Sequence, residues 1–185
     1  SWASSNGTHL SWFGVFSSRL PIHWEDDRDR CRKESWPGLR VFNEWRESGY
    51  ELNMYAPGDL AYRDMRNHFF GEERRVFSLV RDDIETDPMH GKDLSERERI
   101  LLESFKADIS HRVHEKSIGS DGGLFTVFCI DSPHFYYQWH KDFDPPFKPY
   151  FQGTYLPSRP DDDELQLVKN KYQNALAWSD TLVEN

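Results

Sequence analysis

An apolar run at residues 124–130 ends directly at a polar cluster. All seven residues of the run are apolar or favour β-strands, which predicts a strand that is buried on both faces. Asp131, Ser132, Pro133 and His134 follow at once. Ligands of open α/β sheets bind beyond the carboxyl ends of the strands. We therefore expect Asp131 and His134 to lie where such a fold carries out its chemistry.

Apolar residues at helical spacing predict five helices. These helices span about residues 8–20, 37–48, 60–70, 95–116 and 161–182. Ser95 and Glu98 form the pattern of a capping box at the start of the fourth helix. The last helix has its apolar positions at Leu165, Val168, Tyr172, Leu176 and Leu182. The mixed-charge run at 25–34 predicts a solvated loop or helix face.

Two further segments have the pattern of strands. Apolar and polar residues alternate over residues 50–54, and a short apolar run covers 76–80. Helices and strands therefore alternate along the chain, which predicts an α/β fold with a parallel sheet and helices on both faces. The length of 185 residues is consistent with a single domain, residues 1–185.

Composition narrows the class of protein. Hydrophobic residues make up 37% of the chain and aromatic residues 15%, which is ample material for a core. The net charge of −9 argues against nucleic acid as a partner, because a phosphate backbone requires a basic surface. Cys31 and Cys129 are too few for a disulfide framework, although a bond between them stays open. The sequence contains no run of 18 apolar residues, so it predicts no membrane span. Because the chain opens at Ser1 without a methionine, we expect it to be a segment of a longer protein.

Candidate chemistry lies at two places. Thr8 follows a Ser-Ser-Asn-Gly run and opens a helix, where free N–H groups favour an anion and can support a nucleophile; the alternative is a plain N-cap. His134 at the end of a strand can act as an acid, a base or a donor to an anionic substrate; the alternative is a structural histidine. His111 and His114 share a helix face but lack further metal-ligand candidates nearby.

Four blocks in order resemble the sulfatase-like branch of the alkaline phosphatase superfamily. The similarity is to lipoteichoic acid synthase-like, phosphoethanolamine transferase-like and PbgA-type domains. The blocks are residues 4–21 (SSNGTHLSWFGVFSSRLP), 37–59, 125–150 with its Asp-x-Pro-His-Phe motif, and 167–185. The resemblance implies that the chain is the central part of an incomplete alkaline phosphatase-like domain.

The resemblance also implies a chemistry. Thr8 matches a threonine that becomes covalently phosphorylated and also binds a metal, and His134, with Asp131, matches a substrate-binding block. The cofactor would be a divalent metal, Zn²⁺, Mn²⁺ or Ca²⁺, and its remaining ligands are expected before Ser1 and after Asn185. The mechanism would be in-line attack on a phosphate or sulfate ester. This segment alone is expected to be inactive.

The implied partner is an anionic phosphate or sulfate ester of an envelope lipid or glycan. The implied location is periplasmic or extracytoplasmic, with membrane anchoring only through parts outside this chain. One alternative is a sulfatase-like domain without catalysis that binds lipid or protein as a regulator, with residues 135–139 as its contact surface. A second alternative is an α/β scaffold with an unrelated binding role.

Overall fold

A computed structural model describes residues 8–33, 35–71, 77–82, 92–115, 123–134, 136–153 and 158–184. The chain divides into two compact units. The first unit consists of Ser1–Tyr55, Asp59–Asp82 and Glu115–Phe128. The second consists of Ala56–Gly58, Asp83–His114 and Cys129–Asn185.

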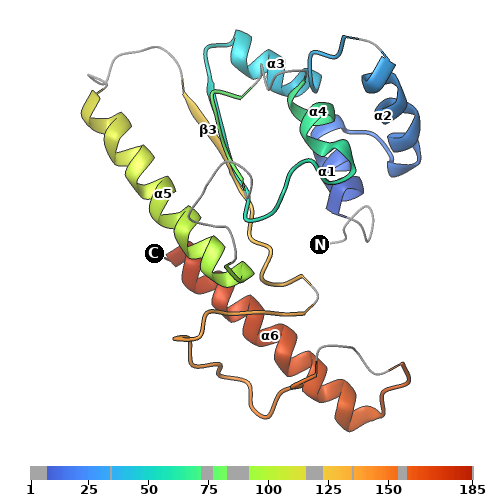
Figure 1. Ribbon diagram of the computed structural model, residues 1–185, viewed down its shortest axis with the longest axis vertical. Helices are drawn as coiled ribbons and strands as arrows, with labels where there is room; N and C mark the ends of the chain where they lie inside the picture. The colour runs from blue at the N-terminus through green and yellow to red at the C-terminus, as the bar shows by residue number, and fades with distance from the viewer. Residues whose placement is uncertain are drawn as a thin grey trace. The chain divides into compact units, whose positions relative to one another are not determined.

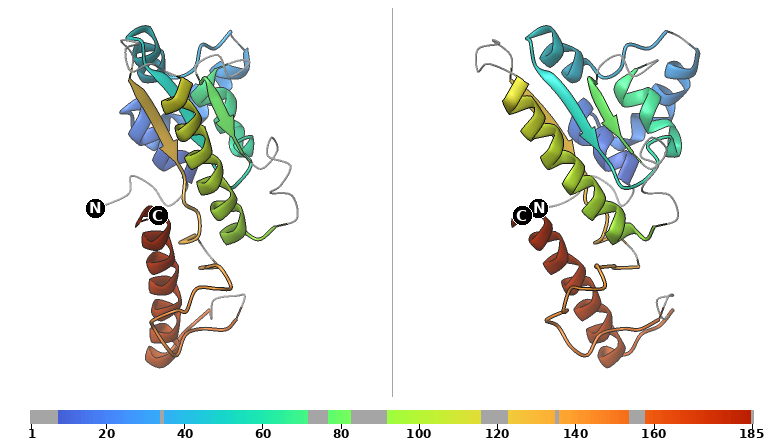
Figure 2. Two further views of the ribbon diagram at one scale, coloured as in Figure 1. Left: turned by 90° about the vertical axis from the view of Figure 1, so that its left-hand side faces the viewer. Right: turned by 60° about the vertical axis from the view of Figure 1, so that its left-hand side comes forward.

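A parallel sheet forms the centre of the first unit (Figures 1 and 2). Its strands are β1 (Glu51–Tyr55), β2 (Leu79–Arg81) and β3 (Leu124–Phe128), in the order β2-β1-β3. Both pairings of β1 are parallel. This sheet, together with the helices around it, confirms the predicted α/β class with a parallel sheet.

The burial of the strands differs from the sequence prediction. Residues 52–55 of β1 are all buried, including Asn53, because β1 is the central strand. The predicted strand at 124–130 ends earlier, at Phe128, and its residues are only half-buried. β3 pairs on one side with β1 and is an edge strand among the described strands. The expectation of a strand buried on both faces is therefore wrong for β3.

Helices α1 (Thr8–Ser17), α2 (Trp24–Lys33), α3 (Arg40–Glu47) and α4 (Met65–Phe70) belong to the first unit, with 3-10 turns η1 (Pro21–His23) and η2 (Tyr62–Asp64). They enclose an aromatic core, in which Phe13, Trp24, Phe42, Phe69 and Phe70 are at most 1% exposed. Aromatic rings supply much buried area per side chain, so few residues are needed to form this core.

Two predicted helices of this unit end or break at left-handed residues. The first helix ends at Ser17 because Ser18 has φ 55°, and Leu20 is consequently 64% exposed instead of packed. The helix predicted at 60–70 is interrupted at Arg63 and Asp64, whose φ values are 54° and 63°. The charged run at 25–34 forms most of α2, and it is largely exposed as expected.

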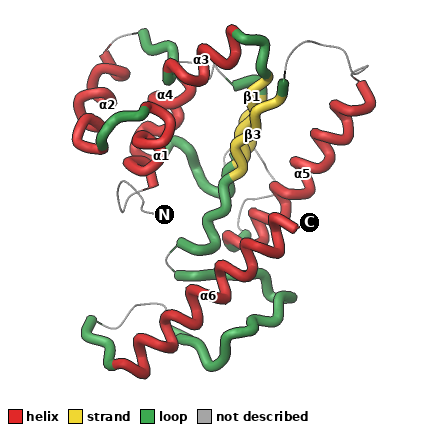
Figure 3. The backbone as a smooth tube through the Cα atoms, turned by 180° about the vertical axis from the view of Figure 1, so that it is seen from behind, coloured by secondary structure: helices red, strands yellow, loops and turns green. Residues whose placement is uncertain are grey.

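The second unit contains the helices α5 (Leu94–Glu115) and α6 (Asp162–Glu184). A long irregular segment, residues 129–134 and 136–153, lies along α6 (Figure 3). Asn174 ties the two together: its side chain accepts a hydrogen bond from Phe147 N at 2.9 Å and donates one to Phe147 O at 3.0 Å. Asn170 donates to Pro149 O at 2.7 Å.

The buried face of α6 includes Leu182, as its apolar spacing predicts, but otherwise consists of residues outside the predicted set. Asn174, Ala175, Trp178 and Leu182 are buried, whereas Leu165 and Leu176 are each 38% exposed. The irregular segment offers backbone polar groups, and Asn174 satisfies them better than a leucine would.

No described helix has both the length and the apolar character to cross a membrane. Cys31 and Cys129 are free thiols, so the disulfide left open by the sequence is not formed.

We expect Asn174→Ala to lower the free energy of unfolding by about 2 kcal/mol, because it removes both hydrogen bonds between the buried Asn174 carboxamide and the part-buried backbone of Phe147. Asn170→Ala on the same helix is the matched control and should cost about 0.5 kcal/mol, since the two hydrogen bonds of its side chain, to Pro149 O and from Gln166 Nε2, are exposed to water. Urea denaturation measures both values. Equal losses in the two variants would contradict the role given to Asn174.

Candidate functional site

The Asp131–His134 segment forms a compact turn in the second unit. His134 N donates to Asp131 O at 2.7 Å, and Tyr137 N donates to His134 O at 2.8 Å. Gln138 N donates to Ser132 O at 3.1 Å, which closes the turn on the chain that follows it. Ser132 is buried and His134 is exposed. The turn therefore presents an imidazole outward from a backbone that is held by its own hydrogen bonds.

Glu98 of α5 holds this turn from the inside. Its Oε1 accepts hydrogen bonds from Asp131 N and Ser132 N, both at 2.6 Å. Its Oε2 accepts from Trp178 Nε1 at 3.1 Å and from the Ser132 hydroxyl. The Glu98 side chain is fully buried. Burial raises the pKa of Glu98, and the hydrogen bonds from Ser132, Trp178 and Asp131 oppose that rise.

The predicted capping box of Ser95 and Glu98 is therefore wrong. Asp93 caps α5: its Oδ1 accepts from Glu96 N at 2.9 Å and from Ser95 Oγ at 2.7 Å. An aspartate at this position already satisfies the first turn of the helix. Glu98 is left to bond residues that lie more than 30 positions further along the chain.

Asp131 lies where two loops meet. A Cβ placed on Gly58, in the loop after β1, would lie 3.8 Å from Asp131 Oδ2. Burial raises the pKa of Asp131, and the charge of His134 opposes this effect. Asp131 and His134, both predicted from the sequence, are thus close enough for His134 to influence the pKa of Asp131.

A second acid–histidine pair, which the sequence did not reveal, joins Glu96 of α5 to His140 of the irregular segment. His140 Nε2 lies 2.9 Å from Glu96 Oε2, and the imidazole stacks on Trp178 with ring centres 5.8 Å apart. Hydrogen bonds from Arg99 and then His140 lower the pKa of Glu96 to about 2. No spacing rule connects these positions, because α5 and the irregular segment meet only in the folded unit.

Thr8, the predicted nucleophile, is the first residue of α1 in the first unit. Its side chain and residues 1–7 lie outside the described residues. Asp131 and His134 belong to the second unit. The expectation that Thr8 shares a site with His134 stays a prediction.

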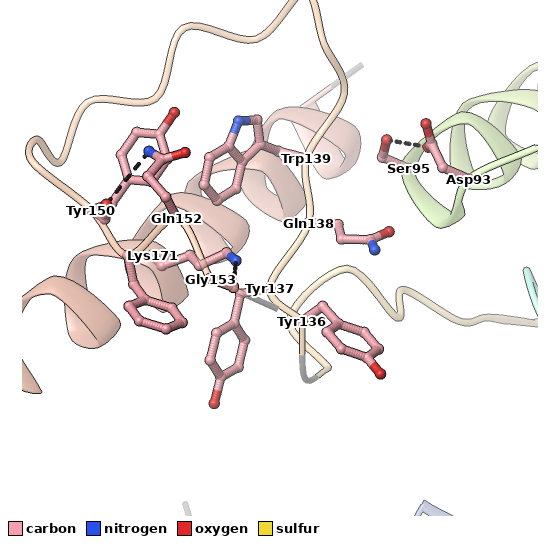
Figure 4. Close-up of a pocket in the computed structure, with 11 residues that line it drawn as sticks. Asp93, Ser95, Tyr136, Tyr137, Gln138, Trp139, Tyr150, Gln152, Gly153 and Lys171 are labelled. Carbon is pink, nitrogen blue, oxygen red and sulfur yellow. Dashed lines mark hydrogen bonds between the residues drawn. The ribbon is translucent and has the colours of Figure 1, made fainter. Parts of the chain in front are cut away.

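The second unit contains a pocket of about 420 Å³ (Figure 4). Its lining includes Tyr136, which is two positions after His134 in the sequence. Aromatic side chains form much of its lining: Tyr136, Tyr137, Trp139, Tyr150 and Phe151. Trp139 and Tyr150 pack edge to face with ring centres 5.1 Å apart. Tyr137 packs in the same manner on Tyr172 of α6, at 5.3 Å. These contacts hold the rings in place without a ligand.

Polar groups complete the lining of this pocket. They are Asp93, Ser95, Gln138, Gln152 and Lys171. Lys171 Nζ donates to Gly153 O at 3.1 Å and lies 5.7 Å from the centre of the Phe151 ring. Burial lowers the pKa of Lys171. The sequence analysis marked residues 135–139 as a contact surface but did not include Tyr150, Phe151 or Lys171.

The divalent metal implied by the resemblance has no complete ligand set in this part of the chain. Among the described residues there is no group of three or more His, Cys, Asp or Glu side chains that could hold a metal ion. Structural and catalytic metal sites take at least three protein ligands. The described residues thus do not fit a metal centre by themselves.

Comparison with known proteins identifies no relative: no family model, curated protein or solved structure matches this chain.

Proposed function

We propose that this chain is the central part of a sulfatase-like, alkaline phosphatase-like domain that acts on phosphate or sulfate esters. The observation that supports the proposal most directly is the turn held by Glu98, which follows a parallel strand and presents His134 outward. Parallel α/β folds bind ligands at this position. A rigid turn also reduces the entropy that is lost when a donor is fixed against a substrate.

His134 is the group in this turn that is suited to an anionic oxygen. The N–H groups of Asp131 and Ser132 are already bonded to Glu98 and are not directed to a ligand. The imidazole of His134 is exposed, and it can donate a charge-assisted hydrogen bond to phosphate or sulfate. Asp131, with its raised pKa, repels such an anion less than an ordinary aspartate would.

Thr8 has the role of nucleophile in this proposal. Its hydroxyl would lose its proton as the oxygen forms a bond to phosphorus or sulfur and the ester bond to the leaving group breaks, and the departing oxygen would take up a proton to give the free alcohol. Water or an acceptor hydroxyl would then release the group from Thr8. The position of Thr8 at the start of α1 supports this role, because a helix N-terminus favours an anionic product.

We expect His134→Ala to weaken the binding of inorganic phosphate and of phenyl phosphate about tenfold, which corresponds to the loss of one hydrogen bond to a charged group. Isothermal titration calorimetry of the chain measures the dissociation constants. His111→Ala, an exposed histidine of α5, is the control and should bind as the unaltered chain does. Unchanged binding in His134→Ala would refute the assignment of this residue to the ester group.

A second candidate function is binding of lipid or protein without catalysis. The exposed aromatic side chain of Tyr136, beside Tyr137 and Trp139, favours it, since such rings are typical of binding surfaces. The metal content of the whole domain separates the two functions. Stoichiometric Zn²⁺, Mn²⁺ or Ca²⁺ in elemental analysis supports the ester chemistry and argues against the non-catalytic alternative.

A further inference from the structure

The aromatic pocket of the second unit combines ring faces with hydrogen-bonding groups, and the ester chemistry uses none of its residues. Its volume of about 420 Å³ is within the range of small-molecule sites. Figure 4 shows the Gln138 carboxamide in the space between the aromatic side chains and the Asp93–Ser95 pair. The lining therefore offers apolar contacts and polar groups to the same ligand.

We propose that this pocket binds a saccharide, with its aromatic side chains against the C–H faces of the sugar ring and its polar side chains at the ring hydroxyls. This inference goes beyond the proposed function, and it does not depend on Thr8 or His134. The mixture of groups in the lining and the backbone conformation of Tyr137 both favour a sugar.

The lining disfavours the two other common classes of small ligand. A purely apolar ligand would displace water from Asp93, Gln138 and Lys171 and would offer them no new hydrogen bond in its place, which costs free energy. A ligand with several phosphates would need several cations, whereas the described residues of the lining include one amine, Lys171, together with the carboxylate of Asp93.

A sugar ring can contact the aromatic side chains of the lining and also form hydrogen bonds with its polar side chains. Its C–H faces are apolar and fit against Trp139 or Tyr137, whose rings present broad apolar surfaces. Its hydroxyls both donate and accept, so they can pair with the carboxamides of Gln138 and Gln152 and with the carboxylate of Asp93. The ammonium of Lys171 already donates to Gly153 O at 3.1 Å, and it has further N–H groups that can donate to a hydroxyl oxygen.

The backbone at Tyr137 gives independent support. Tyr137 has φ 54°, in the left-handed region that bulky residues rarely adopt. Such conformations cost free energy and persist where the surrounding structure holds them, often at ligand sites. Here the hydrogen bond from Tyr137 N to His134 O and the contact with Tyr172 fix the residue, and its ring lines the pocket.

Saturation-transfer NMR of the whole chain with glucose, galactose, N-acetylglucosamine and glucuronic acid tests the inference. We expect transfer to the ring protons of at least one of these sugars, and calorimetry then gives its dissociation constant. Gln138→Ala should weaken binding about fivefold, because it removes hydrogen bonds from the site. Gln173→Ala is the matched control, since Gln173 is an exposed residue of α6 outside the lining and should leave binding unchanged.

Trp139→Ala should weaken binding about tenfold or more through loss of ring contact. Because that variant also loses the packing on Tyr150, Gln138→Ala carries the test if Trp139→Ala does not fold. The inference is overturned if no sugar of the panel shows transfer, or if Gln138→Ala and Gln173→Ala bind equally well. His134→Ala should retain sugar binding, so failure of this inference is distinguishable from failure of the proposed ester chemistry.

Discussion

Glu98→Leu is expected to lower the free energy of unfolding by about 4 kcal/mol, a large effect for one substitution. The carboxylate of Glu98 is fully buried and accepts hydrogen bonds from two backbone N–H groups, the Ser132 hydroxyl and the Trp178 indole. Leucine would leave all these donors buried without a partner, and each such donor costs about 1–3 kcal/mol before the site relaxes. Urea denaturation followed by tryptophan fluorescence measures the loss.

Two further variants separate hydrogen bonding from charge and from helix effects. Glu98→Gln keeps one acceptor oxygen and should lose about 2 kcal/mol, roughly half the effect of leucine. Glu103→Leu alters an exposed glutamate of α5 that pairs with Lys106 at 3.2 Å, and it should change stability by less than about 0.5 kcal/mol. Similar losses in Glu98→Leu and Glu103→Leu would show that Glu98 does not hold the turn.

The stability of the first unit should fall as the pH decreases from about 6.5 to about 4, because of His68. This side chain is fully buried, and neither ring nitrogen has a hydrogen-bond partner among the described residues. Burial lowers the pKa of His68 from 6.5 to about 4. Between these values the unfolded chain binds the proton and the folded chain does not. The stabilisation is thus complete above pH 6.5, and about 3 kcal/mol is lost on acidification.

His68→Phe isolates this effect. The imidazole lies among aromatic rings, with Trp24 and Phe69 at ring-centre distances of 4.9 and 5.3 Å, so a phenyl ring fits the surroundings. Glu98 and Asp131, whose pKa values are raised, change stability in the opposite direction, and they do so equally in both proteins. The difference in unfolding free energy between the two proteins should therefore grow as pH falls below 6.5. A difference that does not depend on pH would refute the assignment to His68.

Local patterns predicted the elements of this fold better than their packing. Apolar spacing indicated α1, α5 and α6, and alternation indicated β1, because these signals depend on neighbours in the sequence. The same signals predicted the burial of Leu182 in α6 but missed that of Asn174, Ala175 and Trp178. Asn174 is buried because its carboxamide pairs with Phe147, a residue of the distant irregular segment.

The candidate site was likewise predictable from the sequence only where its features are local. The position of Asp131 and His134 after a strand was visible in the sequence, and so was the aromatic character of residues 135–139. Glu98 carried the pattern of a capping box, and only the folded unit shows that Asp93 takes that role. Lys171 and Tyr150 join the pocket through contacts between α6 and the irregular segment, which no spacing along the chain reveals.

The register of the sheet also determines when a growing chain can complete its first unit. β1 pairs with β3 from Glu51 opposite Leu124 to Tyr55 opposite Phe128, and all of α5 is synthesised between these two strands. Until β3 leaves the ribosome, the buried strand β1 lacks one of its neighbours and exposes an open edge that can pair with other chains. A nascent chain stopped before Leu124 should therefore aggregate, although nearly all the aromatic core of the first unit has already been made.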